Sequence, residues 1–178
     1  MRRVLPGVTL MLLAAACGAP DREAKPPGPA APTAAAPRAG RQLTDAERAA
    51  MLAALGGEQG GPRTVWFAVT PGDAEAVAFK NAFEAVFKQA GWTTETQPVT
   101  GMALKPGLSI LIAAEEPPAY VSAVQQALQA TSYDFKAGVG YGAYYAERKQ
   151  ADPKWPGIPL AAGQDFVVVI GPQPPPAS

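Results

Sequence analysis

Apolar residues are concentrated in three short runs of strand length: 64–69, 108–113 and 166–170. Each run is nearly continuous rather than alternating, which is typical of strands that are buried on both faces. We therefore predict that these runs form the centre of a β-sheet. Two more polar segments, 93–99 and 135–141, are predicted as edge strands. Pro98 fits an edge because proline cannot donate to a strand ladder.

Helical periodicity is strongest in residues 74–90, whose apolar side chains recur on one face: Phe79, Phe83, Val86, Phe87 and Ala90. Asp73 is a suitable N-cap for this helix. A second helix is predicted over 118–130 and a short one from Thr44, where Thr44 and Glu47 match a capping box. Residues 142–163 lack such a pattern and are predicted as a long irregular loop.

The predicted order is a helix followed by β-α-β-β-α-(β)-β, in which the bracketed strand is 135–141, and it indicates a single small α/β domain with an open sheet. A ferredoxin-like α+β sandwich is the alternative. It follows if the residues between Val99 and Leu108 form a hairpin rather than a crossover. Two to three helices are expected in either case.

The first 17 residues have the pattern of an export signal. Arg2 and Arg3 precede the apolar stretch 4–13, and small residues lead to Cys17, the only cysteine. About ten apolar residues rise only ~15 Å as a helix, too little to span a bilayer. The segment resembles a bacterial lipoprotein signal peptide with its lipobox. The resemblance implies cleavage before Cys17 and attachment of lipid chains to it, and Gly18 in place of aspartate favours the outer membrane.

These patterns divide the chain into four parts. Residues 1–16 are predicted as a signal peptide, and residues 17–41 as the lipidated cysteine and a disordered linker rich in proline and alanine. Residues 42–172 are predicted as the α/β domain and 173–178 as a disordered proline-rich tail.

The predicted domain also resembles a soluble domain of many membrane-anchored bacterial proteins. The resemblance is carried by the capping-box helix from Leu43, by Val65-Trp66-Phe67 and by the stretch from Gly72 to Ala76. It continues from Phe83 to Trp92 and ends with residues 168–172. It implies domain boundaries and anchoring, and no activity.

Composition excludes several kinds of chemistry. The chain has no histidine, which removes the commonest general base and zinc ligand, and an acylated Cys17 leaves no thiol. After loss of Arg2 and Arg3, 13 basic side chains stand against 15 acidic ones, so no basic surface for nucleic acid is expected. We predict no cofactor and no bound metal.

Three carboxylates and three aromatic residues are the candidate site residues. Asp73 follows the first buried strand, and Glu115 and Glu116 follow the second. Ligands of open α/β sheets bind at such strand ends, so the three are expected in one crevice. Tyr144, Tyr145 and Trp155 fall in the predicted loop and form a candidate binding patch. The glycines at 138, 140 and 142 are predicted to permit a bend in an edge strand.

The sequence thus predicts a lipid-anchored protein of the bacterial cell envelope, on the periplasmic face of the outer membrane. Its domain is expected to be a non-enzymatic module that binds an envelope protein or a small ligand. The alternative is a hydrolase or transferase that uses the carboxylates with a divalent cation. Such an enzyme would need these side chains to converge in a pocket.

Overall fold

The computed structural model describes residues 39–56 and 63–175. The predictions for the signal peptide, for Cys17 and for most of the linker concern residues 1–38, which lie outside the described residues. The same holds for Gly57, which with Gly56 is predicted to end the first helix, and for residues 176–178 of the predicted tail.

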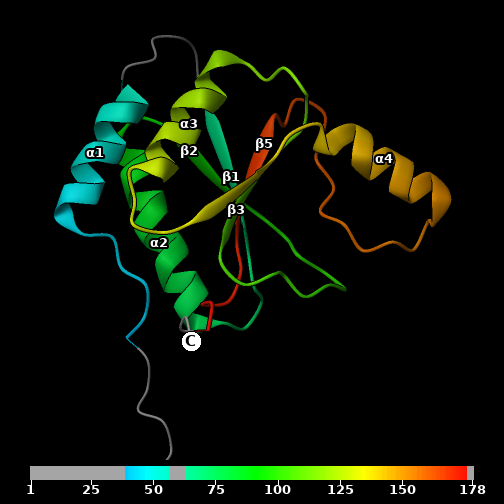
Figure 1. Ribbon diagram of the computed structural model, residues 1–178, viewed down its shortest axis with the longest axis horizontal. Helices are drawn as coiled ribbons and strands as arrows, with labels where there is room; N and C mark the ends of the chain where they lie inside the picture. Colours follow the sequence, from blue (N-terminus) through cyan, green and yellow to red (C-terminus); the bar gives the residue numbers. More distant parts are fainter. Residues whose placement is uncertain (1–38, 57–62, 176–178) are drawn as a thin grey trace, which may run out of the picture. The chain divides into compact units, whose positions relative to one another are not determined.

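Four helices and five strands make up the described chain (Figure 1). In chain order they are α1 (Asp45–Gly56), β1 (Thr64–Val69), α2 (Ala74–Gln89), β2 (Thr93–Gln97), β3 (Leu108–Ile112), α3 (Ala119–Gln129), β4 (Phe135–Gly138), α4 (Tyr141–Ala151) and β5 (Phe166–Ile170).

The strands form one mixed, open sheet in the order β2-β1-β5-β3-β4. β1 is parallel to β2 and to β5, whereas β3 is antiparallel to β5 and parallel to β4. The sheet therefore consists of two parallel β-α-β units that run in opposite directions, with β5 inserted between them. All five residues of β5 are buried, as its central place requires.

The main core lies between one face of the sheet and the helices α1, α2 and α3, which lie together on that side in Figure 1. Four phenylalanines fill its centre: Phe67, Phe79, Phe83 and Phe87. Phe79 and Phe83 meet edge to face at 4.9 Å, the arrangement favoured by the ring quadrupoles. The periodicity of residues 74–90 therefore predicted the right helix and the right inner face.

The other face of the sheet, called here the open face, is covered by irregular segments. Residues 98–107 lead from β2 to β3 across it, and Leu104 packs there on Val167 and Val169 of β5. Ile158, from the segment between α4 and β5, joins the same cluster.

The prediction of an open α/β sheet with buried central strands and polar edge strands is confirmed. The ferredoxin-like alternative is wrong, because β2 and β3 do not pair and are separated by β1 and β5. Residues 98–107 form the crossover and not a hairpin. Their apolar side chains are used to cover the open face.

The prediction of an irregular loop over 142–163 is wrong in nearly its first half, where α4 is found. α4 raises the number of helices to four. Gly140 ends the preceding segment with φ +68° and is the N-cap of α4. This left-handed conformation suits glycine, so the glycine run turns the chain from an edge strand into a helix.

The predicted capping box at α1 is present and has a partner from far along the chain. The backbone N–H of Glu47 donates to Thr44 Oγ1 (3.2 Å), and Glu47 Oε2 accepts from the Thr44 N–H (2.7 Å). Its other oxygen accepts from the N–H of Ser132, just beyond α3 (2.7 Å). These backbone donors lower the pKa of the buried Glu47 carboxyl to about 2, and they tie α1 to α3.

Candidate functional site

The predicted crevice of three carboxylates is not present. Asp73 follows β1, and Glu115 and Glu116 follow β3. Because β1 and β3 pair with β5 in opposite directions, the two strand ends lie at opposite ends of the sheet. The expectation of a shared crevice assumed parallel strands, and the sequence contains no local sign of strand direction.

Asp73 acts as the N-cap of α2. Its Oδ1 accepts hydrogen bonds from the N–H groups of Glu75 (3.0 Å) and Ala76 (3.1 Å). These bonds satisfy donors that the first helical turn leaves free. The side chain thus has a complete structural role.

Glu115 and Glu116 are exposed at the bend after β3. The carboxylate of Glu115 lies directly against Gly140, where a β-carbon would collide with it. Glycine is favoured at position 140 by its φ of +68°, and the exposed Glu115 side chain occupies the space beside it. Among the described residues, no group of three or more histidine, cysteine, aspartate or glutamate side chains is placed to hold a metal ion.

The three predicted aromatic residues do come together. The ring of Trp155 meets those of Tyr144 (5.7 Å) and Tyr145 (5.8 Å) edge to face. Tyr141, which directly precedes the predicted loop, contacts both tyrosines with ring centres 6.2 and 6.1 Å apart. We call Tyr141, Tyr144, Tyr145 and Trp155 the aromatic cluster.

Two cations lie against the aromatic cluster. The guanidinium of Arg148 lies 5.6 Å from the Trp155 ring, and Lys149 Nζ lies 5.9 Å from the Tyr145 ring. Both distances are within the range of cation–π attraction. The cluster therefore combines aromatic surface with positive charge.

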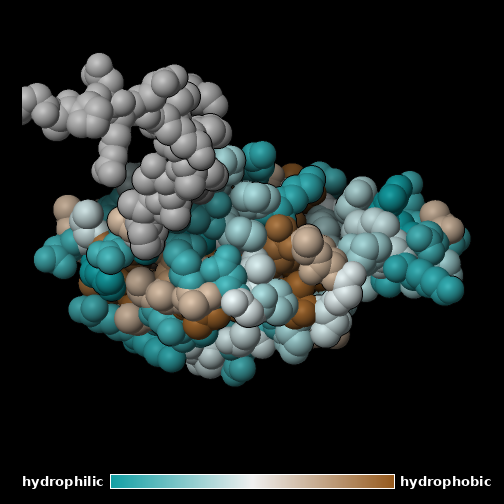
Figure 2. Space-filling view, turned by 90° about the horizontal axis from the view of Figure 1, so that it is seen from below, coloured by the Kyte–Doolittle hydropathy of each residue, from teal (hydrophilic) through white to brown (hydrophobic). Residues whose placement is uncertain are grey.

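The helix α4, which carries most of the cluster, projects from the domain (Figure 1). Tyr141 is its only buried residue, and Tyr144 is 48% exposed. The lobe that α4 forms is coloured mainly hydrophilic in Figure 2, in keeping with its charged sequence. α4 thus contributes little to the core and presents the aromatic cluster at the surface.

Tyr141 fastens α4 to the domain. Its hydroxyl accepts a hydrogen bond from the backbone N–H of Ile158 (3.0 Å), which is itself buried. Burial raises the pKa of the Tyr141 hydroxyl. The same bond fixes the segment after α4, which brings Trp155 back onto the helix.

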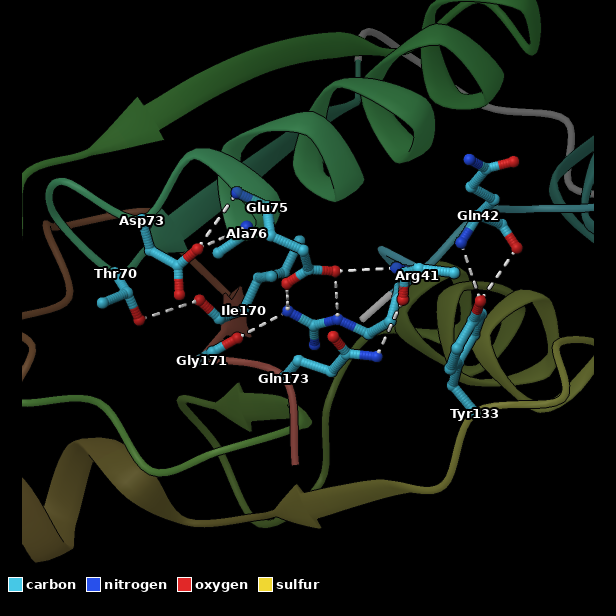
Figure 3. Close-up of polar contacts among 11 residues, drawn as sticks. Arg41, Gln42, Thr70, Asp73, Glu75, Ala76, Tyr133, Ile170, Gly171 and Gln173 are labelled. Atoms are coloured by element: carbon cyan, nitrogen blue, oxygen red, sulfur yellow. Dashed lines mark hydrogen bonds and ion pairs between the residues drawn. The ribbon is translucent and has the colours of Figure 1, made fainter. Parts of the chain in front are cut away.

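A polar cluster that the sequence did not predict surrounds Arg41 (Figure 3). Arg41 Nε and Nη2 form a two-pronged ion pair with Glu75 (2.9 and 2.7 Å), and Nη2 also donates to the carbonyl of Gly171 (2.8 Å). The guanidinium lies 4.6 Å from the Phe79 ring. Hydrogen bonds from Arg41 lower the pKa of the Glu75 carboxyl.

This cluster corrects the predicted domain boundaries. Arg41 was assigned to the linker, yet it is buried and joins α2 to the end of β5. Gln173, assigned to the tail, donates to the carbonyl of Ala39 (3.3 Å). Both residues belong to the domain. No local pattern marks Arg41, because its partners are 34 and 130 residues away.

Two further polar contacts hold the segment before β5. Gln164 is buried and donates to Gln97 at the end of edge strand β2 (2.6 Å). The hydroxyl of Tyr120 donates to Asp165, and burial together with this carboxylate raises the pKa of Tyr120 to about 12. These contacts are structural, since each polar group has a partner within the domain.

The described chain contains surface hollows, among them three of about 290 to 460 Å³. One of about 460 Å³ lies beside β3 and β4 on the open face, and one of about 290 Å³ lies beside Gln97 and Ile158. A third, of about 460 Å³, lies between Arg41 and α2. None of them contains Asp73, Glu115 or Glu116.

Comparison with known proteins gives no match: no family model, no curated protein and no solved structure is significantly similar to this chain. The resemblance of residues 43–172 to a domain of membrane-anchored bacterial proteins therefore stays a prediction. Within the described residues, no helix is long and apolar enough to cross a membrane.

Proposed function

We propose that this protein is a lipoprotein of the bacterial cell envelope whose α/β domain is a non-enzymatic binding module. In this proposal lipid chains on Cys17 hold the protein at the periplasmic face of the outer membrane. Residues 18–38 then connect the anchor to a domain that begins near Ala39. The partner is an envelope protein or a small envelope ligand.

The aromatic cluster is the observation that carries the binding role. Tyrosine, tryptophan and arginine dominate the energetics of interfaces, because they combine large contact area with polar groups. Here they gather on and directly after a helix that buries only one residue. Such a helix is a weak contributor to stability, so its aromatic surface is better explained by contact with a partner.

The binding role is tested by crosslinking in intact envelopes. The wild-type chain is compared with a variant in which Tyr144, Tyr145 and Trp155 are all changed to alanine. A matched control changes Glu147 and Gln150, which are exposed residues of the same helix, to alanine. We expect the wild type and the control to recover one specific partner that the triple variant loses. Equal recovery by all three proteins would refute the role of the cluster.

Anchoring is tested separately by labelling cells with a radioactive fatty acid. We expect label in the wild-type protein and none in the Cys17→Ala variant, with the wild type in the outer-membrane fraction. Since two or more acyl chains hold a protein stably, salt washing should not release it. An unmodified Cys17 thiol in the purified native protein would refute the anchor.

We do not propose the carboxylate enzyme, because no observation favours it. Its three candidate side chains are divided between two ends of the sheet, and Asp73 already caps α2.

A further inference from the structure

The strand β4 forms an edge of the sheet that is open to a further strand. β3 is the only strand that pairs with β4 in the described part of the chain. β4 contains no proline and no bulge residue in the left-handed region. An edge of this kind presents unpaired N–H and C=O groups that an extended segment can pair with.

A groove on the open face runs along the inner side of this edge. The strand register places Ser109 beside Lys136 and Leu111 beside Gly138, and these four side-chain positions form its floor. Residues 105–107 close one end of the groove, whose volume is about 460 Å³. Because Gly138 has no side chain, the floor is hollowed directly next to the edge.

The groove is positively charged. Lys105 and Lys136 line it against a single acidic side chain, Asp134. Both lysines are exposed, and neither belongs to any ion pair found between described residues. The rest of the lining is largely apolar, through Leu111, Pro106 and Pro174.

We infer that β4 and this groove bind an extended acidic segment of another protein, which adds a sixth strand to the sheet. The backbone of the segment pairs with β4. Alternate side chains of the segment point to the open face, where carboxylates meet Lys105 and Lys136 and an apolar side chain fills the hollow over Gly138. The inference goes beyond the proposed function, because this surface shares no residue with the aromatic cluster.

Charge argues against a second copy of the chain as the occupant through its own β4. Antiparallel pairing of two β4 strands around a two-fold axis brings Lys136 of one copy close to Lys136 of the other. Like charges across a strand pair are destabilising. An acidic segment has the opposite effect, and its charge also speeds association.

The test uses the full-length chain with Cys17→Ser and a labelled peptide of eight residues. Every second position of the peptide is in turn glutamate, valine or glutamate, with threonine between them, so that one face carries both carboxylates and an apolar side chain. Binding is followed by fluorescence anisotropy and by the NMR signals of the β4 amides. A peptide with alternate backbone nitrogens methylated serves as one control, because it cannot form a strand ladder. Lys136→Glu is compared with Lys154→Glu, which makes the same charge change at an exposed site outside the groove.

We expect saturable binding with slowed hydrogen exchange across residues 135–138. Methylation of the peptide backbone should abolish binding. Lys136→Glu should lower the affinity for the unmethylated peptide about tenfold, whereas Lys154→Glu should change it by no more than about twofold. No binding at millimolar peptide, or binding that survives methylation, would overturn the inference. So would sedimentation that shows the chain already self-associated through β4. Loss of binding on changing Tyr144, Tyr145 and Trp155 instead would assign the peptide to the aromatic cluster.

Discussion

Replacing Glu47 with glutamine isolates the contribution of one buried carboxylate to stability. Both oxygens of Glu47 accept from N–H donors, of Thr44 on one side and Ser132 on the other. Glutamine has nearly the same shape but turns one acceptor into an NH₂ donor. Whichever way the amide is oriented, it then faces a backbone N–H, and one bond between α1 and its surroundings is lost.

The size of the effect follows from the pKa. Folding lowers the pKa of Glu47 from 4.5 to about 2. At 1.36 kcal/mol per pH unit, the ionised carboxylate stabilises the folded state by about 3 kcal/mol. Since the folded pKa is the lower one, this stability is fully present above about pH 5 and is lost as the pH falls through the folded pKa. About three quarters of it is gone at pH 2.5.

The assay is urea unfolding of wild type and Glu47→Gln at pH 7 and pH 2.5, followed by the fluorescence of the buried Trp92. We expect the variant to be about 2–3 kcal/mol less stable at pH 7 and less than about 1 kcal/mol less stable at pH 2.5. Glu95→Gln, on the exposed edge strand β2, should change stability by less than about 0.5 kcal/mol. A Glu47→Gln difference that stays constant between the two pH values would refute the reasoning.

Three further changes test other contacts by the same unfolding assay. Arg41→Ala leaves a partly buried carboxylate without its partner and should cost about 3 kcal/mol, whereas Lys88→Ala, in an exposed ion pair, should cost less than about 0.5 kcal/mol; equal costs would contradict the role of the buried pair. Gly171→Ala should lower the free energy of unfolding by at least about 2 kcal/mol, because the new β-carbon would overlap the carbonyl of Lys105; unchanged stability would show that the backbone at Lys105 can shift without energetic cost. Tyr141→Phe leaves a buried N–H unsatisfied and should cost about 1–2 kcal/mol; a smaller loss would mean that water replaces the hydroxyl.

Local patterns predicted much of the fold because buried strands and helices carry apolar residues in continuous runs or at regular intervals. Continuous apolar runs marked the three central strands, and the period of residues 74–90 marked α2 with its inner face. The residues of α4 have no such apolar pattern, since only Tyr141 among them is buried. The signal for it was propensity rather than pattern, because alanine, glutamate, arginine, lysine and glutamine all favour helices.

The candidate site was predictable where its members are neighbours in sequence. Tyr144 and Tyr145 share a helix with Tyr141, and Trp155 follows shortly after. The pairing of Arg41 with Glu75 depends on contacts between distant parts of the chain. The separation of Glu115 from Asp73 depends on the direction of the strands that precede them. Neither strand direction nor such distant contacts are encoded in a local pattern of residues.

The hydrogen bond between Ala39 and Gln173 has a practical consequence for engineering. It brings the first and last described parts of the domain into contact, so a bridge of a few residues suffices to join them. A permuted chain opened between the exposed Glu115 and Glu116 would then keep every strand pair intact. Because its two ends are close, the whole domain can also be inserted into a surface loop of a host protein, to which two short adjacent connections would attach it.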